Sequence, residues 1–269
     1  MRRGARPRQR ASCPAPPDML NGIGAPAAWA ILQRQGEAMQ ARFAARRDNL
    51  AEAERFRARA AEIPTVDALL RDRRTLSMVL EAFQLEGEVD KRAVVRRLLT
   101  EDPADERSFA NRMADPRYRQ INAAFGGRDG APLRDPRLVE RLIQGALVNR
   151  FEKAMGEGNP GLREALYFRR MIGGVASVPA LMADRALTTV VRGALGQPAQ
   201  FGLLSYERQR DFLASRLDPS AFGDAKAMDR LIARYLARAG EGAAQAPADP
   251  RLALLGGAGG SGALLTLTI

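Results

Sequence analysis

Apolar residues recur every three or four positions along most of this chain, and almost no stretch alternates with a period of two. Spacing of this kind is typical of amphipathic helices, whereas half-buried strands alternate. The clearest case is residues 136–155, where apolar residues keep to one face. That face consists of Leu138, Val139, Leu142, Ile143, Ala146, Leu147, Phe151 and Met155. The pattern predicts an all-α fold.

A helical hairpin is predicted over about residues 136–173. The segment 156–160 combines Gly, Asn and Pro and breaks the first helix, and a second helix is expected from Leu162 to about Ile172. Other helix starts are indicated by residues whose side chains can accept the free amide protons of the first turn. These predicted caps are Asp48, Thr65, Asp72, Asp90, Asp115, Asp135, Ser177, Asp184, Ser205, Asp218 and Asp224.

One motif occurs twice, starting at Thr65 and again at Ser177. Each copy has a hydroxyl residue, then apolar residues at helical spacing, then an Asp-Arg pair, and the match continues without a gap to Phe83 and Leu195. We predict a helical unit used twice, in which each Asp caps a helix and each Arg is an exposed charge. A catalytic carboxylate is the alternative for each Asp. The shared structural residues are Val66, Leu69, Asp72, Arg73, Val178, Leu181, Asp184 and Arg185.

The domain predicted from these elements covers residues 19–239 and is a helical repeat-like domain. Its first unit is expected at about 65–125 and its second at about 177–239, with the hairpin bridging them. Residues 1–18 are basic and rich in proline, and residues 240–269 are rich in Gly and Ala, so both are predicted to be disordered. No apolar run long enough for a secretory signal or a membrane span is found.

Histidine is absent and Cys13 is the single cysteine. The chain therefore lacks the commonest general base and metal ligand, and it has no disulfide framework. The hairpin glutamates could converge on a metal, but the di-iron pattern requires histidine. They are Glu140, Glu152, Glu157 and Glu164. We expect no enzyme activity, no catalytic, cofactor-binding or metal residue, and no cofactor.

The formal net charge of +11 raises nucleic acid as a partner. Five arginines fall in the first ten residues, and the others are interleaved with Asp and Glu. Dispersed charge argues against nucleic-acid binding, for which basic residues cluster on one face. A basic nucleic-acid-binding helical protein, using arginines within 92–97 and 137–150, is kept as the alternative function.

Two further features need an interpretation: a lone tryptophan and a glycine-rich segment. Trp29, the single tryptophan, is predicted to be either a core anchor or a contact for a protein partner. The glycine-rich segment 126–130 lacks both the spacing of a phosphate-binding loop and a preceding strand, so a helix end followed by a loop is predicted.

Several segments taken together point to a family. They are residues 22–24 and 29–34, the motif around Asp72-Arg73, residues 110–118 and the segment 195–217. Over about residues 20–238 the chain resembles an alphaproteobacterial family, domain of unknown function twelve-seventeen, whose members are often labelled flagellar proteins.

The resemblance implies a process and no mechanism. It implies a non-enzymatic protein-interaction or structural protein associated with flagellar assembly or the flagellum, and so with bacterial motility. Its partners would be proteins, among them flagellar components. Its location would be cytoplasmic, or the flagellum after export without a cleavable signal.

Overall fold

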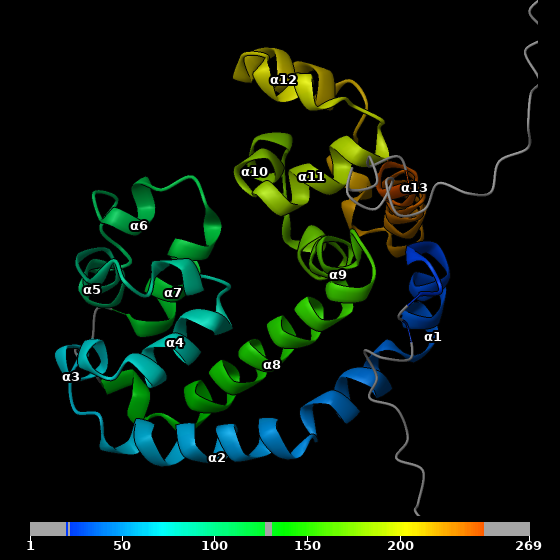
Figure 1. The fold of residues 1–269 in the computed structure, drawn as a ribbon. Coiled ribbons are helices and arrows are strands. Elements are labelled where there is room, and N and C mark those ends of the chain that lie inside the picture. The colour runs from blue at the N-terminus through cyan, green and yellow to red at the C-terminus, as the bar shows by residue number, and fades with distance from the viewer. Residues whose placement is uncertain (1–19, 21, 127–130, 245–269) are drawn as a thin grey trace, which may run out of the picture.

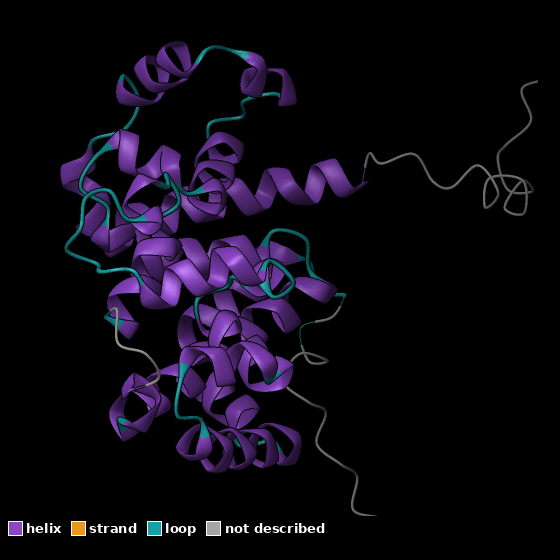
Figure 2. Ribbon diagram, turned by 90° about the vertical axis from the view of Figure 1, so that its left-hand side faces the viewer, coloured by secondary structure: helices purple, strands orange, loops and turns teal. Residues whose placement is uncertain are grey.

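The structure is a computed structural model that describes residue 20, residues 22–126 and residues 131–244 (Figure 1). These residues form α-helices joined by loops and short 3-10 helices, and they contain no strand (Figure 2). The predicted all-α fold is confirmed. The predicted extension 1–18 and most of the predicted tail 240–269 lie outside the described residues.

The helix bounds follow the apolar periodicity closely. The first seven are α1 (Ala25–Ala44), α2 (Arg47–Glu62), α3 (Val66–Arg71), α4 (Arg73–Ala82), α5 (Arg92–Thr100), α6 (Phe109–Arg112) and α7 (Pro116–Phe125). The others are α8 (Pro136–Gly158), α9 (Leu162–Met171), α10 (Val178–Ala183), α11 (Arg185–Ala194), α12 (Tyr206–Ala214) and α13 (Ala225–Ala244). The 3-10 helices are η1 (Glu86–Glu88), η2 (Ala131–Arg134), η3 (Ile172–Gly174), η4 (Ala199–Leu203) and η5 (Pro219–Gly223).

Most predicted caps are confirmed. At each Asp-Pro start the carboxylate accepts the backbone N–H of the residue two positions later, at 2.9 Å for both Asp115 and Asp135. Ser205 accepts from Arg208 N at 3.4 Å, and Asp224 accepts from Lys226 N at 2.8 Å. These bonds satisfy amide protons that the first helical turn leaves without a partner, which is why the helices begin at these residues.

Two predicted caps are wrong. Helix α2 begins at Arg47, so Asp48 lies inside its first turn, where a negative charge is favoured by the helix dipole. Helix α5 begins at Arg92 after Lys91, and Asp90 instead forms an ion pair with Arg73. In both places the sequence offers a suitable side chain, but the helix starts one or two residues away from it.

The predicted start of the tail is also wrong by five residues. Helix α13 continues through Gly240 to Ala244, although the tail is predicted to begin at residue 240. Glu241, Ala243 and Ala244 are good helix formers, and a single glycine costs a helix only about 1 kcal/mol. A helix that is already packed along its length can therefore continue through the glycines.

The helices are arranged around two hydrophobic cores. One core joins α2–α7 to the amino-terminal half of α8, and the other joins α1, the carboxyl-terminal end of α8 and α9–α13. Figure 1 shows α8 running from the α2–α4 group up to α9. In the second core the Phe43 ring of α1 meets the Phe151 ring of α8 edge-on, with centroids 5.7 Å apart. We call the helices around the first of these cores the first lobe and those around the second core the second lobe. The predicted hairpin is formed by α8 and α9, and α8 contributes to both lobes.

Two glycines allow helices to cross closely. A Cβ atom added at Gly145 of α8 would lie 2.8 Å from the Ala82 carbonyl oxygen at the end of α4. A Cβ atom at Gly193 of α11 would lie 2.5 Å from Cδ2 of Tyr235 in α13. Side chains at these positions would push each pair of helices apart, since protein interiors are close-packed.

We predict that Gly145→Ala destabilises the protein by about 1–3 kcal/mol, the usual effect of overpacking. Gly36→Ala is the matched control, because Gly36 lies inside α1 and an added Cβ would meet nothing within 4 Å. The control should be stabilised by about 0.5–1 kcal/mol, the intrinsic advantage of alanine in a helix. Urea unfolding of both variants measures the difference, and equal shifts would contradict the close crossing.

Candidate functional site

The repeated motif forms the same local structure in both copies. Each has a six-residue helix, α3 or α10, followed by a ten-residue helix, α4 or α11. Thr65 Oγ1 accepts from Ala68 N at 3.2 Å, and Ser177 Oγ accepts from Ala180 N at 3.3 Å. The shared apolar residues are all buried: Val66, Leu69, Val178 and Leu181. The motif is therefore a capping and packing unit.

The duplication extends past the end of the sequence match. Gln84 and Gly196 hold the same place after α4 and α11, and both have left-handed backbone, with φ of 58° and 67°. The next residues close the same turn, Leu85 N onto Leu80 O and Gln197 N onto Arg192 O, each at 2.9 Å. This helix ending favours glycine, and another residue there costs roughly 1–2 kcal/mol. Gln84 offsets part of that cost by donating from its side chain to Glu152 at 2.8 Å.

The two motif aspartates have different side-chain partners from outside the motif. Asp72 Oδ1 accepts from Thr75 N at 3.1 Å, and Oδ2 accepts from Arg59 Nε at 2.6 Å near the surface. Asp184 is 5% exposed; it accepts from two backbone N–H groups of α11 and from the Tyr167 hydroxyl at 2.6 Å. Burial, and then the hydrogen bond to Asp184, raise the pKa of Tyr167 well above its usual value. Both aspartates lie at helix starts, where their oxygens are occupied.

The motif arginines also differ. Arg73 is exposed, as predicted, and its ion-pair partner is Asp90 of the loop before α5. Arg185 is exposed as well and lines a cleft of about 420 Å³ between the lobes, beside Tyr167 and Asp184. No ion pair of Arg185 is found among the described residues. The two copies thus share a backbone and differ in the charges around them.

We predict different costs for the same substitution in the two copies. Asp72→Ala removes a helix cap and should cost about 1 kcal/mol. Asp184→Ala removes a cap and leaves the buried Tyr167 hydroxyl without its acceptor, which adds about 1–3 kcal/mol. The double variant Asp184→Ala/Tyr167→Phe should recover most of that added cost. Chemical unfolding of the three variants provides the measurement, and equal losses for the two aspartates would contradict the assigned partners.

A set of paired polar side chains, which we call the polar waist, lies where α8 passes from one core to the other. Arg150 contacts Glu81 at 2.7 Å and Glu52 at 2.5 Å, and Lys153 pairs with Glu86. Glu152, only 2% exposed, accepts from Arg170 at 2.9 Å as well as from Gln84. These contacts tie α8 to α2, to the end of α4 and to α9. Because charges buried without partners are costly, the set is stabilising only as a whole.

The hairpin glutamates do not converge. Glu140 pairs with Arg57 at 2.5 Å on the outside of the first lobe, Glu152 lies in the polar waist, and Glu157 is exposed. Within residues 22–126 and 131–240, no three Asp, Glu, Cys or His side chains are grouped so that they could hold a metal ion. The expected lack of catalytic and cofactor-binding residues stays a prediction.

Glu86 shows how the polar waist affects stability. Burial on its own raises the pKa of the Glu86 carboxyl group, but hydrogen bonds from Lys153 and Asn149 outweigh it, so the pKa lies below its usual value. A carboxyl group with a lowered pKa in the folded state stabilises the protein above its unfolded pKa. That stability is lost as the pH falls through the folded value.

We predict that Glu86→Gln lowers stability at neutral pH but makes it less dependent on pH. The wild-type protein should lose more unfolding free energy than the variant between about pH 5 and pH 3, where the extra proton binds to the unfolded chain. Glu157→Gln, at an exposed position of α8, controls for the loss of one negative charge. Parallel pH profiles for the wild type and Glu86→Gln would contradict the pairing with Lys153.

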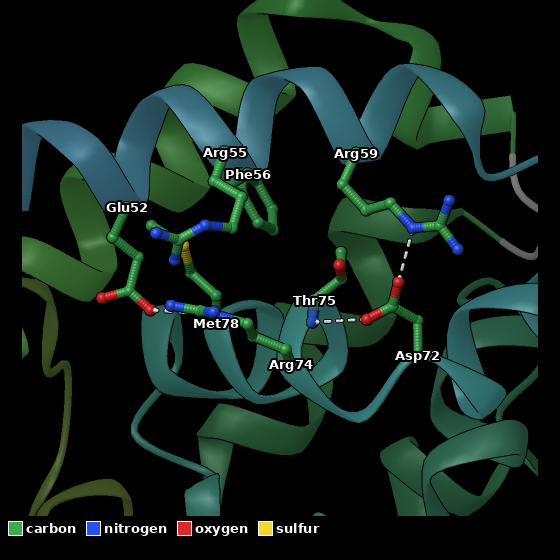
Figure 3. A pocket seen from close by; sticks show the side chains of 8 residues that line it. All are labelled: Glu52, Arg55, Phe56, Arg59, Asp72, Arg74, Thr75 and Met78. Carbon is green, nitrogen blue, oxygen red and sulfur yellow. Dashed lines mark hydrogen bonds and ion pairs between the residues drawn. The ribbon is translucent and has the colours of Figure 1, made fainter.

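A small groove lies between α2 and α4 (Figure 3). Its volume is about 190 Å³, and its floor is formed by the buried side chains of Phe56, Thr75 and Met78. Both carboxylates on its rim are paired, Asp72 with Arg59 at 2.6 Å and Glu52 with Arg150 at 2.5 Å. Each carboxylate that lines the groove is therefore bonded to an arginine, and this pairing does not favour a role in acid–base catalysis.

Exposed apolar side chains gather at one place in the second lobe. Leu203, Leu204 and Tyr206 are 85%, 39% and 49% exposed, where η4 leads into α12. Figure 1 shows α12 at the outer edge of the molecule, beyond α10. We call these three residues the apolar corner. The sequence contains a signal for it, since Leu203 and Leu204 come just before the predicted cap Ser205 and belong to no predicted helix face.

Trp29, the predicted alternative contact, is not part of any exposed surface. Its side chain is 5% exposed and packs in the second core with other residues of α1. The structure therefore agrees with the core-anchor alternative and gives Trp29 no exposed surface for a partner. Periodicity could not decide between the two, because a face that packs in a core and one that binds a partner have the same spacing.

Arginines of the predicted nucleic-acid segments are partly neutralised. In α5, Arg96 pairs with Asp67 and Arg97 with Glu101; in α8, Arg150 belongs to the polar waist. These pairs do not favour a phosphate-binding face, and nucleic-acid binding stays an untested alternative. Along the part of the chain that the structure describes, no helix has the length and apolar character needed to cross a membrane.

The sequence model of a family described as "Protein of unknown function (DUF1217)" matches residues 82–228, more than half of the chain. The chain belongs to this family. The resemblance noted from the sequence is thereby confirmed at the level of the family. The match starts at the end of α4 and ends in α13, so it includes the second copy of the motif and omits most of the first.

A solved structure has a similar fold. It is the crystal structure of protein AGR_C_984 from Agrobacterium tumefaciens, with a TM-score of 0.70 and 23% sequence identity. The likeness covers 79% of this chain and 91% of that chain. Among proteins with curated descriptions, none matches this member of the DUF1217 family. The comparisons therefore give a family and a fold, without an activity.

Proposed function

We propose that this protein is a non-enzymatic helical protein that works by binding other proteins, in flagellar assembly or in the flagellum. The observation that carries the protein-binding part is the apolar corner, three large exposed apolar side chains within four residues. Exposed apolar groups scattered singly are normal, but a group of them marks an interaction surface.

The surrounding structure supports such a role. In the sequence the apolar corner lies between two rings that pack together: the buried Phe201 meets the partly buried Phe212 of α12 edge-on, with centroids 5.2 Å apart. Gln209 donates to the Leu204 carbonyl oxygen at 2.7 Å, which holds the backbone of the corner against α12. A rigid backbone lowers the entropy lost when exposed side chains bind a partner.

The charged groups support binding over catalysis. The motif aspartates cap helices, and Glu81, Glu86 and Glu152 are paired in the polar waist. The flagellar part of the proposal rests on the label that family members often carry. On the same basis the protein acts in the cytoplasm, or in the flagellum after export without a cleavable signal.

We predict that Leu203→Glu/Tyr206→Ala weakens binding to flagellar components by about 2 kcal/mol or more, roughly 30-fold, as expected for anchor residues of an interface. Leu50→Glu is the matched control, since Leu50 is 52% exposed but stands alone on α2. Tagged protein from motile cells is tested for retained flagellar components, and thermal unfolding checks that each variant is folded.

Two results would overturn parts of this proposal separately. Recovery of no flagellar component, together with normal motility of a deletion strain, would remove the flagellar process. Equal retention by the wild type and the Leu203→Glu/Tyr206→Ala variant would remove the apolar corner as the binding surface.

A further inference from the structure

A second surface of the same lobe is a groove between η5 and α13. Its volume is about 540 Å³, in the range of sites that hold a ligand or a few side chains of a partner. The floor is apolar and firmly packed, with Phe222, Met228 and Leu231 each exposed by 5% or less. Partly exposed alanines and Leu217 complete the walls.

The rim of this groove is positively charged. Arg216, Arg230 and Arg234 line it, and Asp218 is the one acidic residue among the lining side chains. The Asp218 carboxylate already accepts from Ser220 N at 2.9 Å. Within the described residues none of the three arginines forms an ion pair, whereas Asp229 on another face of α13 pairs with Arg169. The groove thus combines an apolar floor with an excess of positive charge.

Part of the groove is formed by residues along one face of α13. Ala227, Arg230, Leu231 and Arg234 lie at positions i, i+3, i+4 and i+7, so they form one stripe along the helix that holds both apolar and basic residues. A second helix laid along such a stripe would place its own apolar residues at matching intervals. Acidic residues beside that apolar face would lie next to the arginines, which favours the correct partner and its orientation.

We propose that this groove binds an amphipathic helical segment of a partner protein, with an apolar face flanked by Glu or Asp. The inference deepens the proposed function, since it rests on the protein acting through protein binding, and it names the chemistry of one partner. A free anion would use the arginines but not the floor, and an apolar helix without acids would leave the arginines without a partner.

The test uses the full chain and a labelled synthetic peptide of about 18 residues, long enough to form a helix. The peptide carries Leu at positions three and four apart and Glu on both flanks, and a second peptide has Lys in place of Glu. We expect the Glu peptide to bind at least tenfold more tightly than the Lys peptide at about 50 mM salt, and to weaken at about 300 mM salt. Fluorescence polarisation measures both.

The groove variant is Arg230→Glu/Arg234→Glu, and it should bind the Glu peptide at least about tenfold more weakly than the wild type. The control Arg137→Glu/Arg141→Glu makes the same change in net charge, at the same spacing, at exposed positions of α8 outside the groove, and it should bind like the wild type. Thermal unfolding verifies that both variants are folded.

Three outcomes would overturn the proposal. One is equal binding of the Glu and Lys peptides, or no binding of either. Another is self-association of the wild type, measured by sedimentation, that is absent in the groove variant. That result would identify a second copy of this chain as the occupant of the groove. The third is an oligonucleotide that displaces the peptide from the wild type and binds more weakly to the groove variant but not to the control variant. The assay contains no flagellar component, so its failure leaves the apolar corner to be judged by the retention experiment with the Leu203→Glu/Tyr206→Ala variant.

Discussion

Helix α8 contributes side chains to both hydrophobic cores, and this shared helix determines how the two lobes are placed. Its residues from Leu138 to Leu147 belong to the first core, and Phe151 and Met155 belong to the second. Where α8 passes from one core to the other it carries Asn149, Arg150, Glu152 and Lys153, which are bonded to the end of α4, to η1, to α2 and to α9. A helix apolar on all sides could slide or rotate between two cores, whereas a polar waist with assigned partners sets its position.

The duplicated motif shows that one local structure can serve two environments. The backbone is the same from the hydroxyl cap to the left-handed residue after the second helix. Asp72 of the first copy lies near the surface and accepts from an arginine, whereas Asp184 of the second copy is buried and accepts from a tyrosine hydroxyl. The capping geometry depends on residues within the motif, while the side chain that donates to each aspartate from outside the motif comes from a neighbouring helix. The motif could therefore be reused without conserving its surroundings.

The second lobe differs from the first in what it leaves exposed. In the first lobe, pairs such as Arg57–Glu140 and Arg73–Asp90 neutralise charges on its surface. In the second lobe, the apolar corner and the arginine-rimmed groove lie at the two ends of α12. Exposed apolar groups oppose the hydrophobic stabilisation of the fold, and excess like charge opposes compactness. Both features are consistent with surfaces that are covered when the protein meets a partner.

The amino-acid sequence by itself determined the helices, most of their caps, the hairpin and the duplicated motif. All of these depend on residues within a few positions of each other, which periodicity and capping chemistry describe well. The tertiary structure alone decided the burial of Trp29, the pairing of Asp90 with Arg73 and the choice of Arg59 or Tyr167 as partner of an aspartate. It also decided that Leu203, just before the predicted cap Ser205, stays exposed while Leu213 of α12 is buried. Such outcomes depend on which helix faces meet across long stretches of chain, and the spacing of residues along one helix carries no information about its neighbours.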